Sequence, residues 1–366
     1  MERLYIDAAA IDFPAVSVIR SRLAGVPVEI LDGPSAVFRC VEAASDPIAA
    51  GKRVLYLAVN RGRFLRPCPG TRNYHCCGYQ ILHVGAFCTM DCAYCILQAY
   101  FHPAVLTFFV NHEDLFTELS QTLAERPANV RRLGTGEFTD SLIWEPLSDL
   151  NARLVSLFGA QDHAALELKS KSTAVERLLG LPHNRKTILA FSVNTGAAIR
   201  ENERRTAPLE ARLAAAEKSA AHGFPLAFHF DPMILYPGCE AEYEEVARAI
   251  FRRVPQDSVA WVSLGTFRFM PDLKPIVARR FPASKIPYGE FIPGADGKMR
   301  YYKPLRTALF TRVAAAIREA APSVTVYFCM EDDAVWREAL GFSPDEKGGL
   351  ARILDEAASR VCGISI

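Results

Sequence analysis

The sequence predicts an α/β protein in which a small mixed unit precedes a larger repeating one. The first observation is that apolar, strand-like segments alternate with amphipathic helical segments from residue 79 to residue 269. The second is a shorter pattern of strands and one helix before residue 60. The third is the stretch 60–79 between them, which is rich in Arg, Gly, Pro and Cys and has no periodicity. Regular alternation of strands and helices predicts a parallel sheet or barrel with right-handed crossovers.

The small unit is predicted from the pattern of the first residues. Strand-like runs lie at 3–9, 26–31 and 52–59, and a helical pattern lies at 14–25. Short strands with a helix at this spacing are typical of a small α/β domain. We therefore place a domain boundary near residue 70, with one domain at 1–70 and the other at 71–366.

The larger unit contains six predicted strands, each with an apolar run that suits a buried position in a sheet. These strands lie at 79–87, 130–138, 164–172, 186–194, 225–235 and 259–269. Helices are predicted among them at 111–126, 147–160, 173–180, 208–223 and 239–254. The segment 103–111 is also strand-like, but its place in the fold is open. One more strand at 323–331 and two helices extend the unit toward its C-terminus.

The composition is that of an ordinary globular protein. Hydrophobic residues make up 50% and charged residues 23% of the 366 residues, enough apolar surface to offset chain entropy. Acidic residues stand where a signal peptide needs basic ones, and no apolar run reaches the roughly eighteen residues of a membrane span. We therefore expect a cytoplasmic protein that has no membrane span.

The net charge of +1 argues against a strongly basic protein that coats nucleic acid. Any contact with nucleic acid would then need local patches of Lys and Arg. Two stretches offer such patches: Arg61, Arg63, Arg66 and Arg72 in the first, and Lys298, Arg300, Lys303 and Arg306 in the second. Two tyrosines interleave with the second patch, and aromatic rings there favour stacking on bases.

Polar or thiol side chains follow every predicted strand of the larger unit. They are Cys88, Cys92, Cys95, Glu137, Lys169, Lys171, Ser192, Asn194, His229, Asp231 and Arg268. Ligands of such folds bind at the carboxyl ends of the strands, so this set predicts the site. His229 and Asp231 are two residues apart and face the same side of their strand. They are candidates for binding a polar substrate edge or relaying a proton, and a hydrogen-bonded core pair is the alternative.

Three cysteines at the spacing C-x3-C-x2-C follow the first strand of the larger unit: Cys88, Cys92 and Cys95. They are either unrelated buried thiols, or part of a zinc site, or ligands of a [4Fe–4S] cluster. A zinc site needs a fourth ligand, for which His75, Cys76 and Cys77 are candidates. A cluster held by three thiolates instead leaves one iron open for another molecule. Cys68, Cys76 and Cys77 have no regular spacing, but they are candidates for a second metal site.

The cysteine spacing, with Tyr94 just before the last cysteine, resembles the signature of the radical S-adenosylmethionine (SAM) superfamily. The resemblance implies a [4Fe–4S] cluster whose open iron binds the amino and carboxylate groups of SAM. It implies that one electron from the cluster splits SAM, and that the resulting 5′-deoxyadenosyl radical abstracts hydrogen from a substrate. It also implies a catalytic or cofactor-binding position for Tyr94.

Longer stretches resemble the spore photoproduct lyase family, which repairs a UV-induced thymine lesion in DNA. They are "CTMDCAYCILQ", "EFTDSL", "KSKSTAVERLLGLPHNRKTILAFSVN", "APLEARLAAAEKSAAHGFPLAF" and "GTFRF", within residues 75–320. The resemblance implies a partial (β/α)6 TIM-like radical SAM barrel with a small N-terminal α/β (Rossmann-like) domain and a C-terminal strand–helix extension. It also implies a DNA substrate, a flavodoxin or ferredoxin as electron donor, and a monomer.

The same resemblance assigns contacts with SAM to residues after successive strands. Glu137 would accept a hydrogen bond from the methionine ammonium, and Thr139 stands at a SAM-contact serine of the family. Lys171 would pair with the carboxylate, because a cation suits an anionic partner. Ser192 and Asn194 would contact the ribose hydroxyls.

Two departures from the lyase pattern concern the return of hydrogen to the product. The lyases carry a hydrogen-donating cysteine three residues before an acidic residue that is Asp140 here, and this chain has Glu137 at that point. The lyase tyrosine after the last cluster cysteine is Ile96. Cys239 and Cys329 are candidate substitute donors.

The alternatives to a lyase-like function are radical chemistry on RNA, a peptide or a small molecule, or a non-catalytic zinc-binding or electron-carrying module.

Overall fold

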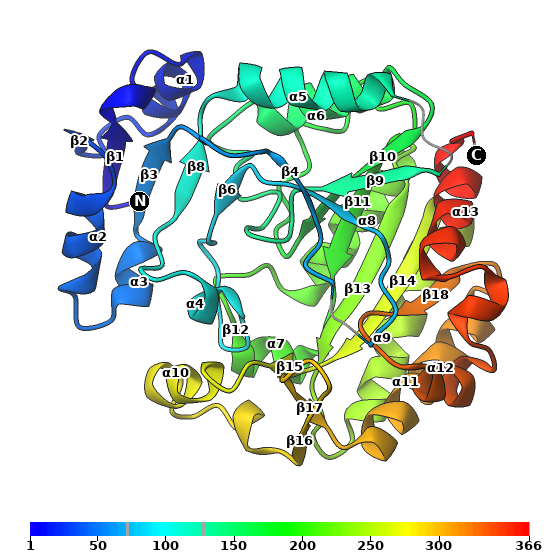
Figure 1. Ribbon diagram of the computed structural model, residues 1–366. Coiled ribbons are helices and arrows are strands. Elements are labelled where there is room, and N and C mark those ends of the chain that lie inside the picture. Colours follow the sequence, from blue (N-terminus) through cyan, green and yellow to red (C-terminus); the bar gives the residue numbers. More distant parts are fainter. Residues whose placement is uncertain (71–72, 126–128, 366) are drawn as a thin grey trace.

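The computed structural model describes residues 1–70, 73–125 and 129–365. It contains a five-stranded sheet and an eight-stranded sheet, together with two small sheets. In Figure 1 the five-stranded sheet, drawn in blue and cyan, lies beside the larger green and yellow sheet. The chain is therefore a mixed α/β protein, as the alternation of strands and helices predicts.

The five-stranded sheet has the order β2-β1-β3-β8-β6. Its first three strands, β1 (Arg3–Asp7), β2 (Val28–Leu31) and β3 (Val54–Ala58), are parallel, as is β8 (Thr107–Phe109) to β3. The strand-like segment 103–111 thus finds its place in this sheet. Because β8 and β6 (Gly85–Ala86) lie beyond residue 70, the predicted boundary there cuts through the sheet.

Helices pack beside these strands. Residues 14–25 form α1 (Pro14–Arg22) as predicted, and α2 (Ser35–Glu42) and α3 (Pro47–Gly51) were not predicted. An aspartate that precedes α3 caps it, because the Asp46 carboxylate accepts a hydrogen bond from the Ala49 amide at 3.0 Å. This cap matters for the site because α3 ends beside Lys52, whose side chain reaches the cysteine loop.

The eight-stranded sheet has the order β18-β14-β13-β11-β10-β9-β5-β4. All of its neighbouring strands are parallel except the edge pair of β4 (Leu65–Pro67) and β5 (Gln80–Leu82). The others are β9 (Arg131–Gly134), β10 (Ala164–Ser170), β11 (Thr187–Ser192), β13 (Leu226–Met233), β14 (Val259–Thr266) and β18 (Thr325–Phe328). The parallel strands follow one another in chain order, which confirms the predicted parallel sheet as an open, curled half-barrel.

Long helices cover the larger sheet in Figure 1. They are α5 (His112–Ala124), α6 (Leu150–Gly159), α8 (Leu209–Ala221), α9 (Cys239–Arg253), α11 (Lys303–Ala320) and α13 (Leu350–Cys362). The helix predicted at 173–180 is wrong: Leu178 N donates to Val175 O at 2.9 Å, so this segment forms tight turns. A second bond of the same i→i+3 kind joins Leu181 N to Leu178 O, and Pro182 directly after it cannot continue a helical ladder. Within the described part of the chain, no helix has the length and apolar character that crossing a bilayer requires.

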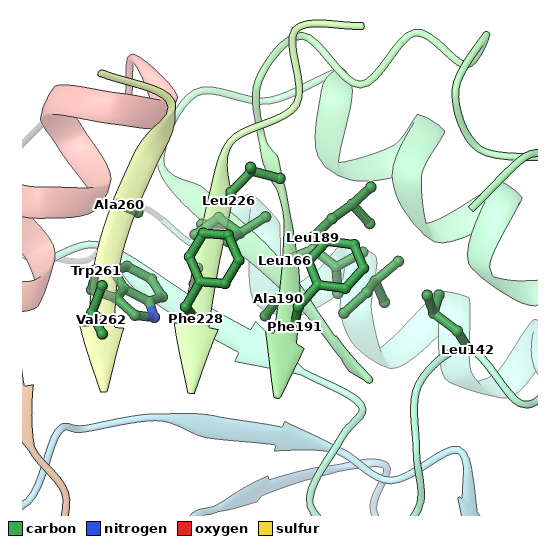
Figure 2. Packing of buried hydrophobic residues seen from close by; sticks show 14 of the residues in the cluster. Leu142, Leu166, Leu189, Ala190, Phe191, Leu226, Phe228, Ala260, Trp261 and Val262 are labelled. Carbon is green, nitrogen blue, oxygen red and sulfur yellow. The ribbon is translucent and has the colours of Figure 1, made fainter. Parts of the chain in front are cut away.

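The core lies between the sheet and these helices. Leu166, Leu189, Phe191 and Phe228 are almost completely buried, and Figure 2 shows them in one contiguous group. Burying each such side chain stabilises the fold by about 1.5–3 kcal/mol. These residues occupy one face of their strands, which leaves the intervening residues to face the inside of the curl.

Candidate functional site

A cavity of about 340 Å³ opens at the concave side of the large sheet. Most of the predicted site residues line it: Cys88, Cys92, Tyr94, Cys95, Glu137, Thr139, Lys171, Ser192, His229, Asp231 and Cys329. Lys169 and Arg268 also line it. The strand ends therefore converge on one cavity, which is what the sequence analysis predicts for a parallel sheet.

Strand periodicity explains why polar side chains gather there. On β10 the alternate residues Glu167 and Lys169, and Lys171 directly after the strand, line the cavity, whereas Leu166 and Leu168 are buried in the core. The same alternation places His229 and Asp231 of β13 on the cavity side. Glu167 was missed by the sequence analysis, although the alternation in "LELKSKS" is a signal that could have found it.

A buried lysine from the small sheet holds the start of the cysteine loop. Lys52 Nζ donates to the carbonyl oxygens of Cys88 at 3.1 Å and Met90 at 2.5 Å, and it lies 3.8 Å from the Asp91 carboxylate. Lys52 is only 3% exposed, and its ammonium stands 4.1 Å from the centre of the Phe87 ring. These contacts fix the backbone on which Cys88 stands.

The end of the cysteine loop is held by a side-chain amide. Gln98, in α4 (Leu97–Tyr100), donates from Nε2 to the carbonyl oxygens of Cys92 at 3.0 Å and Cys95 at 3.3 Å. Arg280, the last residue of α10 (Leu273–Arg280), donates to Gln98 Oε1 and, at 3.1 Å, to an Asp91 oxygen. The loop is thus held in shape by residues that carry no periodic signal in the sequence.

The spacing of the three thiols distinguishes between a zinc ion and a cluster. A single zinc ion with Zn–S bonds of about 2.3 Å would bring its sulfurs to roughly 4 Å from one another. Among the described residues, the sulfurs of Cys88, Cys92 and Cys95 do not all lie within 4.8 Å of one another. An iron–sulfur cluster suits this wider spacing, because each thiolate binds a different iron atom. The three thiols therefore fit a [4Fe–4S] cluster better than zinc.

Tyr94 joins the cysteine loop to a buried ion pair. Its hydroxyl donates to the carboxylate of Glu203, in β12 (Glu203–Arg204), which pairs with β7 (Asp91–Cys92). Arg212 donates to the same carboxylate, and Lys171 Nζ lies 5.6 Å from the Tyr94 ring. Burial opposes ionisation of Glu203, but Lys171 and Arg212 together hold its carboxyl pKa below the ordinary value. Tyr94 therefore anchors the loop through an ionised partner.

The loop after β9 presents an unsatisfied hydroxyl to the cavity. Thr139 is 4% exposed, and its Oγ1 has no hydrogen-bond partner among the described residues. Asp140 next to it accepts from Ser170 Oγ at 2.7 Å and from Lys171 N at 2.9 Å, which ties this loop to the end of β10. A buried hydroxyl without a partner is costly unless a ligand completes it, so Thr139 fits a polar cofactor.

Close backbone contact explains the first glycine of "GTGE". A Cβ atom at Gly134 would stand 1.8 Å from the Tyr79 hydroxyl and 2.7 Å from the Glu167 carbonyl oxygen. Any side chain there would displace Tyr79 from the cavity wall. The glycine therefore permits the packing that brings β5, β9 and β10 together.

The structure does not bring Asn194 and Cys239 to the described cavity lining. Asn194 Nδ2 donates to Pro232 O at 2.9 Å, and its Oδ1 accepts from Tyr243 Oη at 2.6 Å and Thr195 N at 3.1 Å. Its amide is therefore occupied in joining neighbouring elements. Cys239 is completely buried in the core as the first residue of α9. A ribose contact from Asn194 and hydrogen donation from Cys239 have no geometric support.

His229 and Asp231 share a side, as predicted, but each pairs with another residue. His229 Nε2 lies 2.5 Å from Glu167 Oε1 across the sheet. Asp231 accepts two hydrogen bonds from Arg268, at 3.1 and 3.3 Å. The cavity wall therefore carries a His229–Glu167 contact and an Asp231–Arg268 ion pair, rather than the single His–Asp pair that the sequence suggests.

We expect the Asp231–Arg268 ion pair to make the free energy of unfolding depend on pH. Burial disfavours the Asp231 carboxylate, but Arg268 outweighs burial and lowers the carboxyl pKa below its ordinary value. The stabilisation is therefore present above the unfolded-state pKa of about 3.9 and is lost as pH falls through the lower folded-state pKa. Urea unfolding from about pH 6 to pH 3 should show Asp231→Asn approaching the wild type at the acid end. The exposed Asp257→Asn serves as control, and a pH-independent difference for Asp231→Asn would contradict the assignment.

The second basic patch is not the exposed surface that the sequence suggested. Arg300 is 2% exposed and donates to Asp296 at 2.7 Å, and Arg306 is 3% exposed and donates to Glu331 at 3.1 Å. Lys303 pairs with Asp332 at 2.8 Å. In the first patch Arg61, Arg63 and Arg66 are exposed, and Arg72 lies outside the described residues. Buried, paired guanidinium groups are not free to bind phosphate.

Comparison with known proteins identifies relatives of this chain. The sequence model of the family described as spore photoproduct lyase matches residues 2–319. The spore photoproduct lyase of Clostridium acetobutylicum is 22% identical over 288 residues, which is 78% of this chain and 84% of the relative. That of Bacillus subtilis is 29% identical over 207 residues, which is 56% of this chain and 60% of the relative.

Solved structures share the fold. A variant of a spore photoproduct lyase with bound SAM and dinucleoside spore photoproduct superimposes with a TM-score of 0.80 at 23% identity, over 89% of this chain and 98% of the other. A lyase complexed with dinucleoside spore photoproduct gives a TM-score of 0.79 at 22% identity, with the same coverage. Since the family model spans most of the sequence and the half-barrel agrees with it, the chain belongs to the spore photoproduct lyase family.

Proposed function

We propose that the protein is a radical SAM enzyme that abstracts hydrogen from a nucleic-acid substrate, with a thymine photolesion in DNA as the favoured one. One observation carries the proposal: the three cysteines of the signature face a cavity whose other walls offer groups suited to SAM. Membership of the lyase family supports it, as does the related structure that holds SAM and dinucleoside spore photoproduct.

The cluster would be held by Cys88, Cys92 and Cys95, and with SAM bound it would supply the 5′-deoxyadenosyl radical. The residues of this chain bind and orient SAM. Lys171 suits the carboxylate of SAM, and the free Thr139 hydroxyl suits a polar contact near it. Glu137 would accept from the ammonium and Ser192 would contact the ribose, since both line the cavity.

The end of the reaction differs from that of the lyases in this proposal. Glu137 stands in place of the hydrogen-donating cysteine, and Ile96 stands in place of the tyrosine after the last cluster cysteine. Two of the residues that return hydrogen to the product in the lyases are therefore replaced. Of the two substitute donors considered, Cys329 lines the cavity and Cys239 does not. His229, held by Glu167, and Asp231, held by Arg268, are suited to orienting a polar edge of the substrate.

A second candidate is radical chemistry on RNA, a peptide or a small molecule. The observation that favours it is the polar cavity wall of Glu167, His229, Asp231 and Arg268, together with the burial of Arg300 and Arg306 in the second basic patch. A non-catalytic metal module is disfavoured by the spacing of the thiols. We further propose a monomer in the cytoplasm that receives electrons from a flavodoxin or ferredoxin.

The decisive experiment uses anaerobic, reduced holoprotein with SAM and a deuterium-labelled dithymidine lesion. The proposal expects 5′-deoxyadenosine to form and to carry deuterium from the lesion. Formation of 5′-deoxyadenosine that no lesion, DNA or RNA stimulates would contradict a nucleic-acid substrate and leave radical SAM chemistry standing. Weaker binding of lesion DNA at higher salt would support phosphate contacts.

We expect Glu137→Cys to raise the yield of repaired thymine at least about tenfold, equivalent to about 1.4 kcal/mol in barrier height. The reason is that a thiol at this position restores the hydrogen donor that the lyases carry. Chromatography of the dinucleotide products measures the yield. Glu137→Ala is the matched control, because it removes the carboxylate without adding a thiol. Equal product yields for the two variants would contradict a donor role for this position.

A further inference from the structure

A set of exposed basic residues lies beside the cysteine loop. It belongs to three segments: α7 (Gly196–Asn202) with β12 and the residue after it, α10, and the turn η3 (Ile286–Tyr288) with the residue before it. Among the residues that the structure describes, none of these exposed cations forms an ion pair. We call the set the basic face, and its members are Arg200, Arg204, Arg205, Lys274, Arg279 and Lys285.

Backbone contacts place the first of these segments against the cysteine loop. The Ala93 amide, between two of the signature cysteines, donates to Asn202 O at 2.8 Å at the end of α7. In the antiparallel pair of β12 and β7, Arg204 stands opposite Asp91, one residue before Cys92. The basic face therefore begins one strand away from the backbone of a cysteine that would bind the cluster.

α10 and the segment after it adjoin the same place. Ser284 Oγ donates to Asn202 Oδ1 at 2.8 Å, which joins this segment to the end of α7. The guanidinium groups of Arg204 and Arg280 stand 4.6 and 4.9 Å from the centre of the buried Phe281 ring. Since Arg280 also holds the cysteine loop, the end of α10 is fixed against that loop. In Figure 1 α10, drawn in yellow, lies beside α4.

The basic face also presents an aromatic ring. Lys285 directly precedes η3 and Tyr288 ends it, and Tyr288 N donates to Lys285 O at 3.1 Å. Side chains three residues apart in a 3-10 turn lie on the same side of it. Tyr288 is 60% exposed, and Lys274 Nζ stands 5.3 Å from the centre of its ring. The surface thus combines cations with a tyrosine, a residue type that is enriched in protein interfaces.

The positive charge of the basic face is local. Its six cations outnumber the three exposed acidic residues of the same segments, whereas the whole chain carries a net charge of only +1. The three are Glu201, Asp272 and Glu290. Unpaired charges of one sign on one surface attract a partner of the opposite sign and raise its rate of association. The basic face is therefore suited to an acidic partner.

The position of the basic face favours an electron carrier over nucleic acid. None of its six cations belongs to the described lining of the substrate cavity, where a lesion would have to react. Phosphates bound at this face would lie outside that cavity. The face lies instead next to the backbone of Cys92, and a carrier has to come close to the cluster that it reduces.

We propose that the basic face is the docking surface of a small acidic flavin protein of the flavodoxin kind. The proposal rests on the proposed function, because only a redox-active cluster needs a carrier. The exposed Tyr288 ring favours a flavin carrier over a ferredoxin, since an aromatic side chain can pack on a flavin ring. One electron passes from the reduced flavin to the cluster, so the flavin is oxidised and the cluster reduced by one electron each. No bond forms or breaks, and no atom crosses between the two proteins.

Binding and cluster reduction by a flavodoxin test the proposal on anaerobic, reconstituted full-length protein. The probe is a recombinant flavodoxin, oxidised for calorimetric titration and fully reduced for stopped-flow measurement of cluster reduction. R279E/K285E should weaken binding and slow cluster reduction at least about tenfold. Raising the ionic strength from about 0.01 M to about 0.15 M should slow the wild type more than the variant, because the Debye length falls from about 30 Å to about 8 Å.

The matched control is R20E/K347E, which also replaces one arginine and one lysine that are exposed. Arg20 lies in α1, and Lys347 lies in η4 (Pro344–Lys347) between α12 (Asp333–Leu340) and α13, far from α10 in Figure 1. Both double variants change the net charge from +1 to −3, so a difference between them reflects the position of the charges. The neutral variant R279Q/K285Q avoids new acidic groups and should give an intermediate rate.

Flavodoxin binding at the wild-type level in R279E/K285E would overturn the docking surface, as would an equal loss in R20E/K347E. Faster reduction by a ferredoxin through the same residues would overturn the flavin carrier. Loss of lesion-DNA binding in R279E/K285E, with reduction by flavodoxin intact, would assign the face to nucleic acid. SAM cleavage driven by a chemical reductant should match the wild type in every variant. Its absence in the wild type would contradict the proposed function, whereas flavodoxin binding alone decides on the docking surface.

Discussion

Replacing Cys92 by alanine is expected to lower SAM cleavage at least about a thousandfold, equivalent to about 4 kcal/mol of barrier height. Cys92 is buried in the loop that the Gln98 amide holds, and the strand that pairs with it, β12, contributes Glu203 and Arg204 and no thiol. Loss of one of three thiolates leaves two open irons and a cluster that does not persist. Chromatographic measurement of 5′-deoxyadenosine with a chemical reductant gives the result.

The control for this experiment is Cys40→Ser, an exposed thiol distant from the loop in sequence. It should cleave SAM at the wild-type rate. If Cys92→Ala retained more than a few per cent of the activity, Cys92 would not be a ligand of the catalytic cluster. Iron counts on the same samples show whether lost activity follows lost iron.

Replacing Arg212 by methionine is expected to lower the free energy of unfolding by about 3–5 kcal/mol. Arg212 has no exposed surface, and it donates to Glu203, to Ser192 O at 2.9 Å and to Ala207 O at 2.8 Å. The substitution leaves the Glu203 carboxylate buried without its cation, which costs far more than the ion pair itself contributes. Because Tyr94 donates to the same carboxylate, retention of the signature cluster should fall as well. Urea unfolding and iron content measure the two effects.

A surface ion pair provides the matched control for Arg212. Arg253 pairs with Glu210 at 2.5 Å, but both side chains are partly exposed, so Arg253→Met should cost less than about 1 kcal/mol. The double variant R212M/E203Q should recover part of the loss, because no unpaired charge remains. An equal loss of unfolding free energy for Arg212→Met and Arg253→Met would contradict the conclusion that burial makes the Arg212–Glu203 ion pair costly to break.

The sequence predicted the large sheet well because four of its neighbouring strands, β10, β11, β13 and β14, are long and mostly buried. Each of them reads as a continuous buried run, and parallel strands with helical crossovers come together in chain order. The small sheet was predicted only in part: the strand-like segment 103–111, which contains β8, could not be placed, and β6 has too few residues to show a period. The helix predicted at 173–180 is wrong because its backbone closes i→i+3 turns, and the apolar spacing of such turns resembles that of a helix.

The candidate site was predicted in part, for a reason that follows from the fold. Residues at strand ends were found because a parallel sheet gathers them at one edge. Lys52, Gln98 and Arg280, which hold the cysteine loop, were missed because each is a single polar residue whose partner lies far away in the sequence. Asn194 sits where the pattern suggests, but its amide is already satisfied by its neighbours. Hydrogen-bond saturation is a property of three-dimensional contacts that a linear pattern does not contain.

The contact between Lys52 and the cysteine loop bears on how the protein acquires its iron. Lys52 belongs to the small sheet, and Arg280 ties the same loop to Asp46 of that unit at 2.9 Å. The first fifty or so residues are thus a scaffold for the metal-binding loop and not a detachable accessory. A shortened chain that began after β3 would expose the loop carbonyls to water and leave the thiols without a fixed arrangement. In the full-length protein, therefore, the cluster can be loaded only after the N-terminal segment has packed against the cysteine loop, which the ribosome synthesises later.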